Sequence, residues 1–114
     1  MSVKLSTRQA GDVTVVDVSG RIVIGEGSSL IREALRDLTT EGHKKILLNL
    51  GEVSYMDSTG IGELVAGFTS AESAGGTVKL LGLTKHVKDV LQISRLYTVF
   101  EAHDDEAEAV RSFA

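Results

Sequence analysis

The residues with the clearest chemical potential lie together in Asp57-Ser58-Thr59-Gly60, a short polar segment between two apolar stretches. A serine hydroxyl can act as a nucleophile, accept a phosphoryl group or cap the N-terminus of a helix. Aspartate and serine both suit a helix start, so composition alone favours the capping role. Any further role depends on where the surrounding elements place the hydroxyl of Ser58.

The flanking stretches predict a strand before this segment and a helix after it. Residues 46–50 form a nearly unbroken apolar run, which is typical of a strand buried on both faces. After the segment, apolar residues recur at the spacing of one buried helical stripe: Ile61, Leu64, Val65, Phe68 and Ala71. Gly60 and Gly62 remove side chains from the first turn. Ser58 is therefore expected at a helix N-terminus beyond the end of a strand, where partners usually meet open α/β sheets.

Patterns typical of enzymes and metal sites are missing from the sequence. The Gly-x-Ser-x-Gly signature is absent, because Asp57 precedes the serine, and Gly60, Gly62 and Gly67 do not have the spacing of a dinucleotide loop. The three histidines are far apart, with none at the spacing of a helical metal pair, and there is no cysteine. We expect no catalytic activity, no metal and no bound cofactor. Catalytic triads assemble from any chain order, so a hydrolase using Ser58 stays an alternative.

Length and composition predict one ordinary globular domain spanning residues 1–114. The chain has 114 residues, of which 42% are hydrophobic and 25% charged. A formal net charge of −4 argues against direct binding to nucleic acid or to an anionic membrane. No apolar run approaches the roughly 20 residues that cross a bilayer. We expect a cytoplasmic protein, without membrane insertion, whose partners are proteins.

The first half of the chain predicts a hairpin followed by a helix. Residues 3–8 and 13–18 have strand patterns, with a tight turn between them at residues 10–12. Ser19-Gly20-Arg21 is expected to break the second strand, and residues 22–24 are expected to form a loop. Ser28 or Ser29 then caps an amphipathic helix, which Gly42 ends as a left-handed C-cap.

The second half continues as alternating strands and helices. Residues 77–81 predict a strand, Thr84 caps a short helix, residues 96–100 predict the last strand, and a terminal helix begins at Asp104 or Asp105. The fold class is therefore α/β: a single domain with an N-terminal β-hairpin leading into a mostly parallel sheet of about five strands with amphipathic helices.

Residues 53–62, Val-Ser-Tyr-Met-Asp-Ser-Thr-Gly-Ile-Gly, resemble the phosphorylation loop of the anti-sigma factor antagonists, the bacterial single-domain STAS proteins. In that family the serine after the aspartate is the phosphorylated residue. The resemblance covers nearly the whole chain, and its specific part is this loop. Residues 77–83 and 87–91 also look like the family's penultimate strand and helix.

The resemblance implies a non-enzymatic switch. The unphosphorylated form would bind an anti-sigma factor that is also a serine protein kinase and so release the sigma factor. Phosphorylation of Ser58, with ATP held by the kinase, would switch it off, and a serine phosphatase would restore it. The implied partner-binding residues are Met56, Asp57, Ser58, Thr59, Gly60 and Ile61. The alternative is a STAS-type accessory subunit of a transport ATPase or a signalling scaffold, in which Ser58 need not be phosphorylated.

Two features of the loop region leave alternatives open. Family members usually carry an acidic residue after the glycine that ends the second strand, in a segment that commonly contacts the kinase, whereas Arg21 and Val23 lie there in this chain. The resemblance therefore implies the phosphorylated residue and leaves the identity of the kinase open. Met56 is expected at the mouth of the loop, where its flexible apolar side chain either contacts a partner or belongs to the core. Asp57 and Glu63 are expected to make the local surface acidic.

Overall fold

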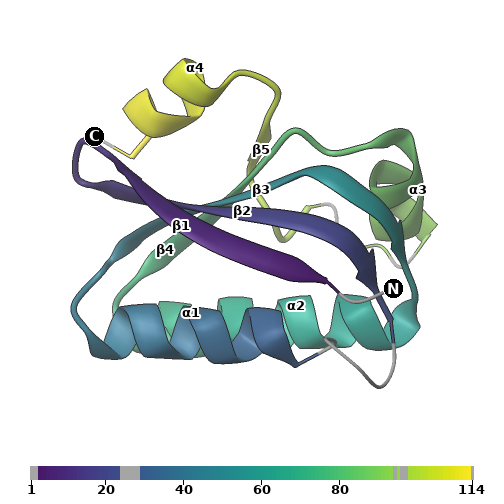
Figure 1. The fold of residues 1–114 in the computed structure, drawn as a ribbon, viewed down its shortest axis with the longest axis horizontal. Coiled ribbons are helices and arrows are strands. Elements are labelled where there is room, and N and C mark those ends of the chain that lie inside the picture. Colours follow the sequence, from purple (N-terminus) through teal and green to yellow (C-terminus); the bar gives the residue numbers. More distant parts are fainter. Residues whose placement is uncertain (1–2, 24–28, 94, 96–97, 114) are drawn as a thin grey trace.

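The structure, a computed structural model, describes residues 3–23, 29–93, 95 and 98–113. Its sheet has five strands in the spatial order β1-β2-β3-β4-β5 (Figure 1). They are Lys4–Ala10 (β1), Val13–Ile22 (β2), Lys45–Met56 (β3), Thr77–Leu81 (β4) and Ala102–His103 (β5). Strand β1 pairs antiparallel with β2, and the other neighbours are parallel. The predicted hairpin and mostly parallel α/β sheet are confirmed.

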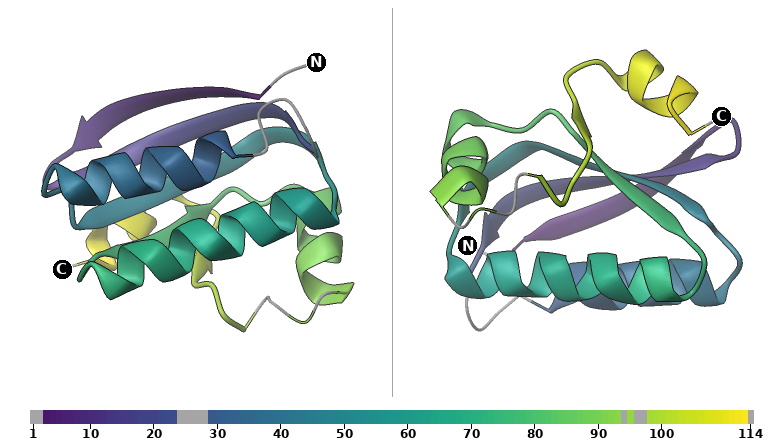
Figure 2. Two further views of the ribbon diagram at one scale, coloured as in Figure 1. Left: turned by 90° about the horizontal axis from the view of Figure 1, so that it is seen from below. Right: turned by 180° about the vertical axis from the view of Figure 1, so that it is seen from behind.

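Helices cover both faces of the sheet. They are Leu30–Thr40 (α1), Ser58–Ser73 (α2), Lys85–Ile93 (α3) and Glu106–Arg111 (α4). Helices α1 and α2 lie side by side across one face, α3 packs near the end of β3, and α4 lies on the opposite face (Figure 2). The close approach of α1 and α2 depends on Gly67, where an added Cβ atom would lie 2.7 Å from Leu35 Cδ1.

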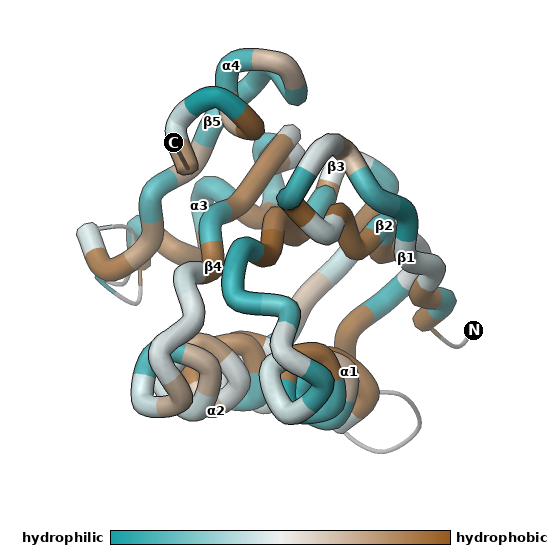
Figure 3. Tube along the Cα trace, turned by 90° about the vertical axis from the view of Figure 1, so that its left-hand side faces the viewer, coloured by the Kyte–Doolittle hydropathy of each residue, from teal (hydrophilic) through white to brown (hydrophobic). Residues whose placement is uncertain are grey.

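The apolar run in β3 is buried on both faces, as its composition predicted. Successive strand residues point to opposite faces, so Ile46, Leu48 and Leu50 join the main core under α1 and α2. Leu47 points the other way and packs in a second cluster under α4, which also contains Val13, Val15, Leu81 and Ala109. Figure 3 shows α4 above the sheet and α1 and α2 below it. The sheet is therefore the middle of three layers.

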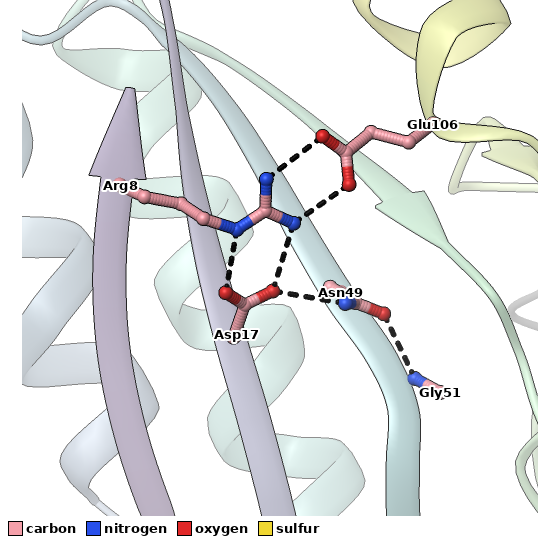
Figure 4. A network of polar contacts seen from close by, with 5 residues as sticks. All are labelled: Arg8, Asp17, Asn49, Gly51 and Glu106. Carbon is pink, nitrogen blue, oxygen red and sulfur yellow. Dashed lines mark hydrogen bonds and ion pairs between the residues drawn. The ribbon is translucent and has the colours of Figure 1, made fainter. Parts of the chain in front are cut away.

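A cluster of polar side chains fastens α4 to the strands (Figure 4). Arg8 Nε donates to Asp17 Oδ2 at 2.7 Å, while Arg8 Nη1 and Nη2 donate to the Glu106 carboxylate at 2.8 and 2.6 Å. Asn49 Nδ2 donates to Asp17 Oδ1 at 2.9 Å, and Asn49 Oδ1 accepts from the Gly51 N–H at 3.1 Å. One guanidinium thus joins β1, β2 and α4.

Replacing Arg8 with methionine should lower the free energy of unfolding by about 1–2 kcal/mol at neutral pH, because paired charge-assisted hydrogen bonds at a half-exposed site are lost. Hydrogen bonding to Arg8 lowers the pKa of both Asp17 and Glu106. A lowered folded-state pKa stabilises above the unfolded-state pKa near 4, and this stabilisation is lost as pH falls through the folded-state pKa.

Thermal unfolding of wild type and Arg8→Met should therefore differ at pH 7, and the difference should shrink as the pH falls below about 4. Arg36→Met is the matched control, since Arg36 is exposed and its ion pair with Asp37 is long, at 3.7 Å. An Arg8 variant with wild-type stability at pH 7 would contradict this role.

Two residues at helix ends, Gly42 and Thr84, act as the sequence predicted. Gly42 has a φ of 95° and follows α1, where His43 N donates to Leu38 O and Gly42 N to Thr39 O, the two bonds of a Schellman motif. Thr84 Oγ1 accepts from Val87 N at 3.2 Å at the start of α3. Ser29 is the N-cap residue of α1 without a side-chain cap bond, and Ser28 lies outside the described residues.

Two predictions of strand ends are wrong. Strand β2 continues through Ser19, Gly20 and Arg21 to Ile22, with register shifts against β3 on both sides of Gly20. Gly20 has a φ of 99°, so it makes an irregularity within the strand instead of ending it. Val23 follows the strand, and Ile24 lies outside the described residues.

The last strand is β5, which lies later than predicted. Of residues 96–100, the first two are outside the described residues, and Thr98 to Phe100 form a turn and a bend. Val99 is 44% exposed, whereas Phe100 is buried and meets Phe68 edge to face at 4.9 Å. Phe100 is an aromatic residue that suggested a strand, but it is a buried residue of a bend.

Candidate functional site

Asp57 is the residue that caps α2. Its backbone is extended, and its Oδ1 accepts a hydrogen bond from Gly60 N at 2.8 Å. Its own N–H donates to Ile22 O at 3.2 Å, which ties the start of α2 to the end of β2. The capping role that either polar residue could have filled therefore belongs to Asp57, and Ser58 becomes the first residue of the helix.

Ser58 is exposed at this position, and Thr59 beside it is half-buried. The first N–H groups of a helix have no acceptor within the helix and carry its positive dipole end. The Ser58 hydroxyl therefore lies at a place that accommodates a negative group, and the cap does not need it. The site also lies beyond the end of β3, as the strand and helix patterns predicted.

Three of the six predicted partner-binding residues are buried. Met56 is 1% exposed and belongs to the main core, which is the second of the two places that the sequence left open for it. Strand alternation explains this burial, because Met56 points to the same face as its partner Ile22, toward the helices. Gly60 and Ile61 are also buried. The part of this segment that a partner can reach is Asp57, Ser58 and Thr59.

Gly60 is needed where α2 crosses the end of β2. A Cβ atom at this position would lie 2.3 Å from Ile22 O and 2.9 Å from Met56 Cγ. By contrast, a Cβ atom at Gly62 would have nothing within 4 Å. The first glycine therefore serves the close contact between helix and strand, and the second does not.

A stack of three side chains lies next to the site and was not predicted. Arg21 lies over the Tyr55 ring at 5.2 Å, and that ring stacks on His86 with centroids 4.7 Å apart. His86 Nε2 lies 3.2 Å from Met56 N and 3.3 Å from Met56 O, so α3 contacts the backbone just before the cap. Arg21 and Tyr55 are partners in the β2–β3 register, which residue types alone do not reveal.

The surface around Ser58 is less acidic than the sequence suggested. Glu63, in the second turn of α2, forms an ion pair with Arg32 of α1 at 2.7 Å. The hydrogen bond from Arg32 to Glu63 raises the pKa of the guanidinium, and this positive charge offsets the acidic side chain beside it. Arg21 adds a further positive charge near the end of β2. Asp57 is the remaining acidic residue next to the hydroxyl.

The described residues place no histidine against Ser58 and gather no cluster of potential metal ligands. Within them, no histidine forms a hydrogen bond with Ser58, and His86 contacts the Met56 backbone instead. The described residues also contain no group of three or more histidine, cysteine, aspartate or glutamate side chains that could hold a metal ion. None of the helices in residues 3–23, 29–93, 95 and 98–113 combines the length and apolar character that a membrane span requires.

A model of the STAS domain family matches residues 4–109 of this chain. The chain belongs to the STAS domain family. The anti-sigma-B factor antagonist of Bacillus subtilis (strain 168) is 29% identical to this STAS protein over 101 residues, covering 89% of this chain and 91% of the relative. The anti-sigma-B factor antagonist of Listeria monocytogenes is 32% identical over 78 residues, covering 68% of each chain.

Solved structures share the fold of this STAS domain. A Thermotoga maritima protein described as a candidate anti-sigma factor antagonist has a TM-score of 0.85 and 26% identity, covering 95% of this chain and 92% of that one. The Bacillus cell fate determinant SpoIIAA, in its phosphorylated form, has a TM-score of 0.72, covering 97% of this chain and 100% of that one. Its 21% identity supports likeness of fold alone.

Proposed function

We propose that this STAS protein is an anti-sigma factor antagonist controlled by phosphorylation of Ser58. Its unphosphorylated form binds an anti-sigma factor that is also a serine protein kinase, and the sigma factor is released. The phosphorylated form does not bind, and a serine phosphatase restores it. The named relatives support this proposal, since those of Bacillus subtilis and Listeria monocytogenes are anti-sigma-B factor antagonists.

The observation that carries the proposal is that Asp57, and not Ser58, caps α2. Asp57 caps α2, so the exposed hydroxyl of Ser58 is left accessible to a kinase. A phosphate there adds about −1.5 to −2 charges beside a helix N-terminus, which tolerates an anion. The modification should therefore change the contact surface and leave the fold intact.

Asp57, Ser58 and Thr59 are the part of the predicted partner-binding segment that reaches the surface. A partner that docks over them must exclude water from the Ser58 hydroxyl. A phosphate at that point opposes docking because it is large, strongly hydrated and negatively charged next to Asp57. The buried members, Gly60 and Ile61, support the shape of this surface from below.

Ser58→Asp protein should bind the anti-sigma partner about 10-fold or more weakly than Ser58→Ala protein, which corresponds to about 1.4 kcal/mol. Isothermal titration calorimetry gives the affinities, and peptide mass spectrometry after treatment with the cognate kinase and ATP should map the phosphate to Ser58. Thr59→Ala protein should still be phosphorylated, because the expected acceptor directly follows the aspartate.

Thr7→Asp is the matched control, since it adds one negative charge at an exposed position of the edge strand β1. It should bind as the wild type does. A phosphate mapped to another residue, or equal affinities of the Ser58→Asp and Ser58→Ala proteins, would refute the proposed switch.

We further propose that the protein has no catalytic activity of its own. The purified chain should hydrolyse p-nitrophenyl acetate and ATP no faster than buffer does, because Ser58 has no base beside it within the described residues. Turnover that disappears in Ser58→Ala protein would instead support the hydrolase alternative.

A further inference from the structure

Arg21 is a cation held beside the candidate phosphorylation site without an acidic partner. Its guanidinium lies over the Tyr55 ring at 5.2 Å, and it forms no ion pair with any carboxylate of the described residues. Tyr55 in turn stacks on His86 of α3. The stack keeps the guanidinium at the end of β2, where no side chain of the described residues is seen to accept a hydrogen bond from it.

The topology brings Arg21 close to Ser58 even though 37 positions separate them in the sequence. Arg21 is opposite Tyr55 in the β2–β3 register, and Ser58 follows Tyr55 by three residues. The chain does not run away from β2 over those residues, because Asp57 N donates to the carbonyl of Ile22, the residue after Arg21. A chain of three residues spans at most about 11 Å, so the backbone of Ser58 lies within that distance of Tyr55, the register partner of Arg21.

Three carboxylates on neighbouring elements already have partners. Glu63 pairs with Arg32 at 2.7 Å, and Asp89 pairs with Lys85 at 3.0 Å. Asp57 Oδ1 accepts from Gly60 N within the helix cap. A new anion on Ser58 would therefore meet a guanidinium that no described carboxylate occupies.

We propose that Arg21 moves off the Tyr55 ring and pairs with the phosphate of phosphorylated Ser58. This inference rests on the proposed function, because it concerns the modified form of the same residue. A guanidinium can donate two parallel hydrogen bonds to a phosphate, and such charge-assisted bonds are stronger than a cation–π contact at an exposed site. The phosphate and the helix N-terminus then hold the guanidinium on the side of α2.

The pairing changes the docking surface in two ways at once. In the unphosphorylated form, the surface beside Ser58 offers Arg21 and the half-exposed Tyr55, two residue types that often dominate binding at interfaces. In the phosphorylated form, the guanidinium is already occupied and the Tyr55 ring has lost its cover. The switch then acts by withdrawing a cation from the partner as well as by adding an anion.

The test uses the full chain with phosphoserine inserted at position 58 during translation, so that no kinase is needed. A ³¹P NMR titration measures the second pKa of the phosphate. In wild-type protein Arg21 should lower this pKa, and Arg21→Gln should raise it by about 0.5 unit or more. Arg21→Lys should recover part of the effect, because it keeps the charge and loses the paired donors.

Arg111→Gln is the matched control. Arg111 is exposed in the last turn of α4, which lies across the sheet from α2, and its removal should leave the phosphate pKa unchanged (Figure 1). The Tyr55 ring signals should also shift on phosphorylation in wild-type protein and much less in the Arg21→Gln protein. Circular dichroism checks that each variant is folded.

Equal phosphate pKa values in wild type and Arg21→Gln would overturn the pairing and leave the proposed function standing. Failure of the cognate kinase to modify Ser58 would refute the proposed function. The pairing would still be measurable, because the phosphoserine protein is made without a kinase.

Discussion

Replacing Gly60 with alanine should lower the free energy of unfolding by about 3 kcal/mol, the upper end of the range for overpacking. The added Cβ atom would lie 2.3 Å from the backbone oxygen of Ile22, and a backbone oxygen in a strand cannot rotate away as a side chain can. Either α2 or the end of β2 must shift. For a domain of this size the midpoint of thermal unfolding should fall by about 12–20 °C.

Gly62→Ala is the matched control, made two residues further along the same helix. It adds a Cβ atom into open space, and alanine favours a helix over glycine by about 0.5–1 kcal/mol, so this variant should be slightly more stable than wild type. Urea unfolding of the three proteins gives the comparison. If both substitutions changed the stability equally, the close contact at Ile22 would not be the reason for Gly60.

The contrast between the two glycines shows what local sequence can predict. Residues that begin and end helices act on neighbours within four positions, so Gly42 and Thr84 were recognisable from the chain alone, and the cap of α2 was narrowed to Asp57 or Ser58. The same holds for the apolar run in β3, whose composition predicted burial on both faces. In the sequence, however, Gly60 and Gly62 look alike. What distinguishes their surroundings is the backbone oxygen of Ile22, which belongs to another strand and lies close to Gly60 only.

The features that could not be predicted depend on contacts between distant parts of the chain. Arg8 and Glu106 are 98 positions apart, and Arg32 and Glu63 are 31 apart. Neither pair has a local pattern, yet the first fastens α4 to the sheet and the second removes much of the expected acidity near the site. Gly20 was misread for a related reason, since pairing with β3 carries the strand past it.

Met56→Ala protein should lose about 3 kcal/mol of stability, within the usual range for deleting a buried large side chain. Met56 is 1% exposed, lies in the main core and contacts the space next to Gly60, so its truncation leaves a cavity under the start of α2. The fold should persist at low temperature, where the affinity for the anti-sigma partner should stay within about twofold of wild type, well below a tenfold change.

Met56→Leu separates packing from contact, because a swap of similar volume usually costs less than about 1.5 kcal/mol. It should recover most of the stability, with partner affinity unchanged. The opposite pattern, wild-type stability with lost affinity in the Met56→Ala protein, would mean that the partner reaches Met56 directly. Burial argues against that outcome: the core already surrounds this side chain, so a partner that touched it would first have to displace Gly60 and the cap that holds Ser58 at the surface.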